Sequence, residues 1–134
     1  MSKIVHLSEA ASIGLHAMVI IAESDKLVKV TEIANKTGAS KNHLSKVMQR
    51  LVKEGLIKSV RGPAGGFLLN KNADSIKLLD IYESIEGKVS VTGCPLDKMV
   101  CPFNKCIMGN LVAKMTNDFI DYFGSQNLKD FISK

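Results

Sequence analysis

Three cysteines close together are the side chains of this sequence best suited to hold a metal or to undergo redox chemistry. They are Cys94, Cys101 and Cys106, and the chain has no others. Thiolates are preferred ligands of iron-sulfur clusters and zinc, and three of them from one short loop can surround a cluster and leave an iron for another ligand. Pro95 and Pro102 directly follow two of the cysteines and stiffen the loop. The favoured interpretation is an iron-sulfur cluster.

The spacing of the cysteines leaves other chemistries open. The spacing, six residues and then four, is neither that of the closely spaced pairs of a zinc ribbon nor that of a ferredoxin. Zinc binding and thiol oxidation would use the same side chains, and inert buried thiols are the remaining interpretation. An odd number of cysteines argues against a framework of structural disulfides.

Length and composition exclude several classes of protein. A chain of 134 residues with 46% hydrophobic residues can form one domain with a modest core. Its longest purely apolar run, Ala17 to Ala22, is far shorter than the about 20 residues that span a membrane, and its first residues do not resemble a secretion signal. The sequence shows no nucleotide-binding glycine loop and no catalytic pair of carboxylates. We therefore expect a cytoplasmic protein that has no membrane segment and is not an enzyme.

A helix-turn-helix pattern precedes the cysteines. We expect a first helix that is capped by Ser8, runs to about Glu23 and is apolar on most sides, and a short helix capped by Thr31 and ended by Gly38. Ser40 caps the next helix, whose apolar residues recur with the period of an α-helix; they are Leu44, Val47, Met48, Leu51 and Val52. Two helices joined by a short turn that contains glycine form a helix-turn-helix, whose second helix enters the major groove of DNA.

Positive charge is concentrated on this second helix and on the segment after it. Six basic residues and one acid, Glu54, lie between Ser40 and Arg61, so this segment carries a charge of 6 − 1 = +5, equal to the net charge of the chain. Such a surface binds phosphates, and polar side chains at the helix start can read base edges. A solvated helix face is the alternative interpretation. The candidate DNA-binding residues are Thr31, Ser40, Lys41, Asn42, His43, Ser45, Lys46, Gln49, Arg50, Lys58, Arg61, Gly62, Gly65 and Gly66.

A hairpin and a further helix complete the expected DNA-binding unit. Strands at 56–59 and 67–69 flank a glycine-rich turn, which is typical of a wing beside a helix-turn-helix. The glycines permit a close approach of the backbone to a phosphate. Asp74 or Ser75 caps the next helix, which ends at Gly87. We expect a winged helix-turn-helix DNA-binding domain at residues 1–87.

A long amphipathic helix follows the cysteines. Its apolar stripe begins at Met108 and continues to Phe123, and Gly124 ends the helix. Because the chain offers little else to cover this stripe, we expect a two-fold homodimer. The cysteine-bearing sensor loop then occupies residues 88–107, and the dimerisation helix with a short tail occupies residues 108–134. The expected fold is mainly α with a small β-wing, a winged helix-turn-helix plus a long dimerisation helix.

Two stretches resemble the Rrf-two family of bacterial winged-helix transcriptional regulators, which has IscR-like and NsrR-like members. They are the wing, Arg61-Gly62-Pro63-Ala64-Gly65-Gly66-Phe67, with the helix after it, and the loop of three cysteines. The resemblance extends from the first helix to the dimerisation helix. It implies a homodimeric repressor that binds a double-stranded DNA operator and whose affinity depends on a [2Fe-2S] or [4Fe-4S] cluster. A family member without a cluster would respond through thiol oxidation, zinc or a docked protein partner.

The resemblance also implies the ligands of the cluster. Cluster-binding members commonly space their cysteines five and five, so the middle thiol of this chain, Cys101, is displaced by one position. IscR-like members use a histidine at the place of Gly109, whereas NsrR-like members use a carboxylate at the start of the partner's first helix, where this chain has Glu9. The implied ligands are Cys94, Cys101, Cys106 and Glu9. His6 is an alternative fourth ligand, and an acid at a helix start also simply complements the helix dipole.

Overall fold

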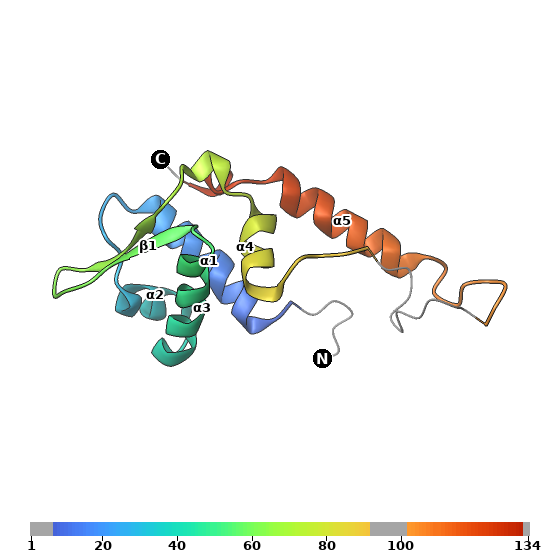
Figure 1. Ribbon diagram of the computed structural model, residues 1–134, viewed down its shortest axis with the longest axis horizontal. Helices are drawn as coiled ribbons and strands as arrows, with labels where there is room; N and C mark the ends of the chain where they lie inside the picture. Colours follow the sequence, from blue (N-terminus) through green and yellow to red (C-terminus); the bar gives the residue numbers. More distant parts are fainter. Residues whose placement is uncertain (1–6, 92–101, 133–134) are drawn as a thin grey trace.

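The computed structural model describes residues 7–91 and 102–132 (Figure 1). Its α-helices are α1 (Glu9–Glu23), α2 (Val30–Thr37), α3 (Lys41–Lys53), α4 (Leu78–Glu86) and α5 (Leu111–Ser125). The strands β1 (Ile57–Val60) and β2 (Gly66–Leu69) form an antiparallel hairpin, and η1 (Ala73–Ser75) and η2 (Leu128–Phe131) are short 3-10 helices. The expected class, mainly α with a small β-wing, is confirmed. In the part of the chain that the structure describes, no helix combines the length and hydrophobicity of a membrane span.

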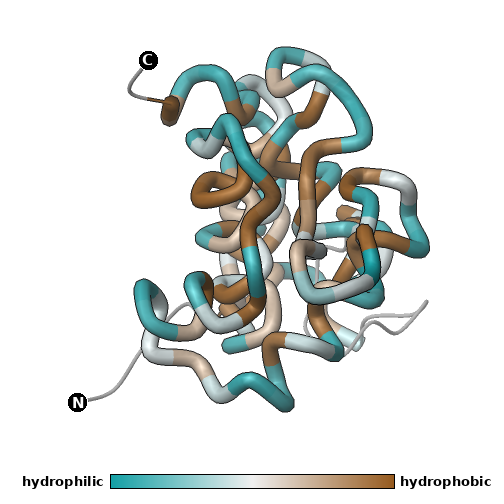
Figure 2. Tube along the Cα trace, turned by 90° about the vertical axis from the view of Figure 1, so that its left-hand side faces the viewer, coloured by the Kyte–Doolittle hydropathy of each residue, from teal (hydrophilic) through white to brown (hydrophobic). Residues whose placement is uncertain are grey.

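The helix α1 lies at the centre of the fold. It contacts α2, α3, α4, β2 and η2, and for this reason Ala11, Ala17 and Met18 are fully buried. The Ser8 hydroxyl accepts the backbone N–H of Ala11 at 3.1 Å, so the expected cap of this helix is confirmed. Figure 2 shows hydrophilic loops around the outside of the bundle. The core therefore forms around α1, and the helix-turn-helix and wing are attached to it.

The helix α3 has one buried and one exposed face, as its sequence period predicts. Its buried residues are Leu44, Val47, Met48 and Leu51. The Ser40 hydroxyl accepts the backbone N–H of His43 at 3.1 Å, which confirms the expected cap. Gly38 has a φ of 77°, a left-handed conformation that glycine adopts at little cost, and it ends α2. These local signals fix the orientation of α3 relative to the core.

The expectation that Thr31 caps α2 is wrong, because the helix is capped two residues earlier. Its N-cap is Lys29, whose backbone is extended and whose carbonyl oxygen accepts the N–H of Glu32 at 3.0 Å. The preceding residue, Val28, forms an antiparallel bridge with Phe67 of β2. This pairing holds the backbone extended up to Lys29, so the tertiary structure sets the start of the helix.

The expected cap of α4 at Asp74 or Ser75 is also wrong. These residues belong to η1, and α4 begins at Leu78 with Lys77 as its N-cap. Lys77 pairs with Asn127 in an isolated bridge, and the N–H of Leu78 donates to the carbonyl of Gln126 at 3.1 Å. The C-terminal tail thus holds this segment extended and delays the helix. The predicted end of the helix at Gly87 is confirmed.

The long helix α5 begins three residues later than the apolar stripe predicts. Gly109 and Asn110 have φ values of 59° and 60°, and this left-handed backbone excludes them from the helix. Phe119 and Phe123 stack with ring centroids 4.2 Å apart and contact Tyr82 of α4 edge-on. Figure 1 shows the segment 102–110 at one end of the molecule and the wing at the other. α5 therefore links the cysteine segment to α4.

Candidate nucleic-acid interface and cysteine site

The exposed face of α3 carries the side chains that can contact DNA. Lys41, Asn42, Lys46 and Gln49 are exposed, on the side of the helix opposite to its buried apolar residues. His43 and Ser45 are half-buried at the edge of this face. A row of hydrogen-bond donors on an exposed helix that follows a tight turn matches the recognition helix of a helix-turn-helix. We call this surface, which consists of the exposed and half-buried residues from Ser40, the cap of α3, to Arg50, the reading face.

The wing projects beside the helix-turn-helix. In its ladder Lys58 pairs with Leu68 and Val60 pairs with Gly66. Lys58, Arg61 and Gly62 are exposed, so their side chains and backbone are accessible to a ligand. The wing adds positive charge next to the reading face.

Two glycines of the wing have a role within the hairpin itself. A Cβ at Gly65 would lie 2.0 Å from the carbonyl oxygen of Val60, and one at Gly66 would lie 2.8 Å from that of Val28. Both neighbours are backbone atoms, which cannot move aside without distorting the hairpin. The sequence predicts that these glycines let the backbone approach a phosphate. The geometry shows that the fold of the wing also requires them.

Arg50 is predicted from the sequence to contact DNA, and its guanidinium also makes a contact within the protein. Its Nη1 donates to the carbonyl oxygen of Ile85 at 2.5 Å, near the C-terminus of α4. A cation at this place complements the negative end of the helix dipole. The N–H of Val89 donates to the carboxylate of Glu83 at 2.8 Å, just beyond the end of the same helix. Arg50 thus connects α3 to the helix that leads into the cysteine loop.

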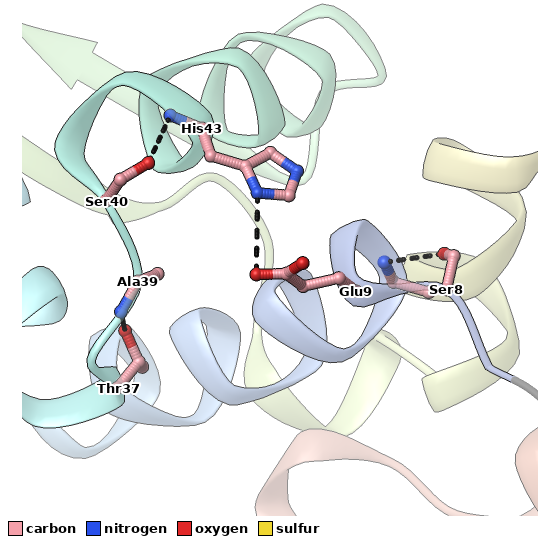
Figure 3. Close-up of polar contacts among 7 residues, drawn as sticks. Ser8, Glu9, Thr37, Ala39, Ser40 and His43 are labelled. Atoms are coloured by element: carbon pink, nitrogen blue, oxygen red, sulfur yellow. Dashed lines mark hydrogen bonds and ion pairs between the residues drawn. The ribbon is translucent and has the colours of Figure 1, made fainter.

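Glu9 lies close to the start of the reading face (Figure 3). Its carboxylate oxygen Oε1 is 3.8 Å from Nδ1 of His43, and the Glu9 side chain is 78% exposed. The preceding residue, Ser8, donates its hydroxyl to the carboxylate of Glu86 at the end of α4. A predicted cluster ligand and a predicted DNA-contacting residue are therefore neighbours within one subunit. His6, the alternative ligand, lies outside the described residues.

Cys106 is the cysteine whose surroundings can be described, because Cys94 and Cys101 lie outside the described residues. It is a free thiol in the turn that precedes α5. The backbone N–H groups of Asn110, Met108 and Gly109, in decreasing order of effect, lower the pKa of this thiol. A lowered pKa favours the thiolate, which is the form that binds metals and reacts with oxidants.

Two of the implied ligands, Cys106 and Glu9, lie among the described residues, and their side chains are of a kind that binds a metal or a cluster. Cys106 is partly exposed and the pKa of its thiol is lowered, and Glu9 has an exposed carboxylate. Among residues 7–91 and 102–132, no group of three or more histidine, cysteine or acidic side chains converges on one point. Glu9 belongs to the start of α1 and Cys106 to the turn before α5.

One side chain that contacts the wing is not expected from the sequence. Lys29 lies outside the predicted DNA-binding set, and its Nζ donates to the carbonyl oxygen of Pro63 in the wing turn at 3.1 Å. The two residues are separated by 34 positions in the sequence. No local pattern predicts such a contact. The antiparallel bridge that brings the two segments together was not predicted either.

Comparison with known proteins identifies the family. The family model described as Rrf2, iron-dependent transcriptional regulator, matches residues 7–134. A protein of Aquifex aeolicus named as an HTH-type transcriptional regulator is 34% identical over 130 residues, which cover 94% of this chain and 90% of that protein. The HTH-type transcriptional regulator IscR of Pectobacterium atrosepticum is 28% identical over 79% of this chain, and the match covers 65% of its own length. These relatives are transcriptional regulators and not enzymes.

Solved structures agree with this assignment. CymR of B. subtilis, the global cysteine regulator, superposes with a TM-score of 0.80 at 24% identity over 97% of this chain and 98% of its own, which shows the shared fold. IscR of T. potens superposes with a TM-score of 0.74 at 26% identity, over 94% of this chain and 85% of its own. The winged helix-turn-helix, the exposed reading face and the match to nearly the whole chain lead to one conclusion: this chain belongs to the Rrf2 family of transcriptional regulators.

Proposed function

We propose that this protein is a transcriptional repressor that binds a double-stranded DNA operator as a homodimer and senses its signal through an iron-sulfur cluster. The single observation that carries the proposal is the exposed, basic reading face of α3, next to an exposed and basic wing. In this proposal residues 1–87 bind DNA, residues 88–107 sense the signal and residues 108–134 form the dimer. Membership of a family of transcriptional regulators supports the DNA-binding part.

Each part of the proposed interface has a different task. Lys46, Lys58 and Arg61 neutralise phosphates, which gives affinity without sequence preference. Asn42 and Gln49 have amide groups of the kind that form paired hydrogen bonds to adenine in the major groove. Sequence specificity therefore resides in the polar residues of the reading face, and salt-dependent affinity resides in the basic residues around them.

Replacing Lys46 by alanine tests the interface. We expect the operator affinity of Lys46→Ala to fall and the slope of log K against log salt concentration to weaken by about 0.9, because one phosphate contact is lost. Fluorescence anisotropy measures both quantities on a duplex that the protein selects from a random pool. Lys129→Ala removes the same charge from an exposed position of η2 and serves as the control. An unchanged slope in Lys46→Ala would remove this residue from the interface.

The helix α5 supports the proposal of a homodimer. None of its residues is buried within the subunit. Leu111 is 54% exposed, and Ile107 and Met108, which lie just before the helix, are 76% and 45% exposed. Contiguous apolar side chains of this size favour association with another surface. A two-fold dimer covers them and presents two reading faces to the two half-sites of an operator.

Replacing Leu111 by aspartate tests this arrangement. We expect Leu111→Asp to shift the protein from dimer to monomer at micromolar concentration, because a carboxylate would be buried without a partner in the interface. Light scattering after size-exclusion chromatography measures the mass. Asn117→Asp introduces the same charge at another exposed position of α5 and is the matched control. A Leu111→Asp protein that remains dimeric would place the interface elsewhere.

The cluster part of the proposal assigns four ligands. Cys94, Cys101 and Cys106 bind the cluster, and Glu9 of the partner subunit supplies the fourth ligand. The iron-sulfur cluster, when bound, would supply iron that oxygen or nitric oxide can oxidise, modify or remove. The lowered pKa of the Cys106 thiol supports its assignment as a thiolate ligand.

The contacts of α4 suggest how a change in the cysteine loop reaches the reading face. The loop begins after Gly87, directly beyond the end of α4. Arg50 of α3 donates to the carbonyl of Ile85, and Ser8 at the start of α1 donates to Glu86. A displacement of the loop therefore acts on α3 and α1 together. Because half-site spacing must match the spacing of the reading helices, a small shift changes operator affinity.

A second candidate function is regulation by thiol chemistry without a cluster. The partly exposed Cys106 thiol with its lowered pKa supports this candidate as well, since a lower thiol pKa promotes oxidation. CymR of Staphylococcus aureus, 25% identical with a TM-score of 0.75, has been solved in an oxidised form. Protein that remains colourless and free of iron after anaerobic reconstitution would favour this function over the cluster.

A further inference from the structure

The base of the wing is fixed to the segment before α2. The N–H of Val28 donates to the carbonyl of Phe67 at 3.0 Å, and the N–H of Phe67 donates to the carbonyl of Val28 at 2.8 Å. Val28 is 1% exposed. Gly66 permits this approach, because a side chain there would collide with the Val28 backbone. The base of the wing therefore cannot move independently of the start of α2.

The turn of the wing is much less enclosed. Residues 61–64 are all exposed. An open hollow of about 370 Å³ lies between this turn and the start of α2, and Lys29, Val30, Arg61 and Pro63 are among its lining residues. The Lys29 side chain lines this hollow and donates from Nζ to the carbonyl oxygen of Pro63 at 3.1 Å. A contact at the turn is thus added to the pairing at the base.

We propose that Lys29 is a positioning residue that holds the wing turn at a fixed distance from α2 before DNA binds. This inference rests on the proposed function, in which Arg61 of the same turn meets the DNA backbone. A turn that is already ordered loses less conformational entropy on binding and so binds more tightly. Lys29 acts through the Pro63 carbonyl, and its own ammonium group does not contact a phosphate.

A methionine at position 29 removes the hydrogen bond and keeps the length of the side chain. In the DNA-free protein we expect Lys29→Met to increase hydrogen exchange of the wing turn about three- to tenfold, the range of one such hydrogen bond. The Gly65 amide, which donates to the carbonyl of Gly62 at 2.9 Å, is the reporter. Operator affinity should fall by a similar factor with an unchanged salt slope. Lys29→Arg should restore both, since arginine also donates to a carbonyl.

The controls and the contrary outcomes are defined by the same measurements. Lys26→Met removes an exposed charge nearby and should leave the exchange of the wing unchanged. If Lys29→Met leaves exchange unchanged but weakens the salt slope by about 0.9, Lys29 contacts a phosphate and the proposal is wrong. Unchanged exchange together with unchanged affinity also overturns it. If the natural chain binds no duplex, the proposed function fails, and the exchange measurement alone still decides the role of Lys29.

Discussion

A Cys106→Ser variant is expected to lose the visible absorption and the bound iron of the anaerobically purified protein. A serine hydroxyl remains protonated at neutral pH and is a poor ligand of iron, whereas the Cys106 thiol has its pKa lowered by the backbone N–H groups of Asn110 and Met108. We expect iron and sulfide to fall to background. The operator affinity of the variant should no longer respond to air or nitric oxide.

The control for this experiment lies in the same segment. Asn104→Ser changes an exposed residue two positions away and leaves all three thiols in place, so its spectrum and iron content should equal those of the natural chain. A Cys106→Ser protein with an unaltered spectrum would remove Cys106 from the ligand set. A natural chain without colour or iron would instead favour regulation by thiol chemistry.

A Gly65→Ala variant is expected to bind its operator about 10- to 100-fold more weakly, with the helical core intact. The added Cβ would lie 2.0 Å from the Val60 carbonyl oxygen and 2.9 Å from the carbonyl carbon of Arg61, so the turn must open. Such rearrangement moves Arg61 away from the place that the hairpin gives it. The expected loss corresponds to about 1.4–2.8 kcal/mol of binding free energy.

Anisotropy titrations and circular dichroism test this prediction together. Ala64→Ser adds one atom at the neighbouring exposed position and should bind as the natural chain does. If Gly65→Ala binds with natural affinity, the wing does not contribute to DNA binding. A loss of helical signal in Gly65→Ala would show that the hairpin is needed for the core, contrary to the role proposed for it.

The elements that follow local rules were predicted from the sequence. Ser8 and Ser40 each accept a backbone N–H three residues later, so both caps are visible in a few residues of sequence. The period of Leu44, Val47 and Leu51 directly gives the buried face of α3. Local chemistry and tertiary structure agree at these places, and the predictions were therefore correct.

The starts of α2 and α4 depend on pairing with distant segments. Val28 pairs with Phe67, and Lys77 pairs with Asn127. The Lys77 bridge keeps the backbone extended beyond Asp74 and Ser75, which a local capping rule selects, whereas the backbone after the Val28 bridge is extended only to Lys29, so α2 begins before Thr31. Hydrogen bonds between residues many positions apart leave no local pattern. For this reason these two helix starts differ from those expected from the sequence.

In the candidate site, too, the residues that follow a local pattern were predicted from the sequence, and the tertiary contacts were not. The exposed basic residues of the reading face follow from the period of α3, and the sequence predicted them as one surface. The contacts of Arg50 with Ile85, Glu9 with His43 and Lys29 with Pro63 are tertiary, and none was predicted. The assignment of the cysteines as cluster ligands came from thiol chemistry and resemblance, and it remains a prediction.

In the proposed function, one bound cluster controls the affinity of the reading face for DNA. The most direct measurement is one anaerobic sample, titrated with an operator duplex selected from a random pool, while visible absorption and iron content are recorded before and after exposure to nitric oxide. We expect a coloured, iron-containing dimer whose operator affinity changes when the absorption changes. A coloured protein whose affinity stays constant after the cluster has reacted, or a colourless protein that binds with the same affinity throughout, would contradict it.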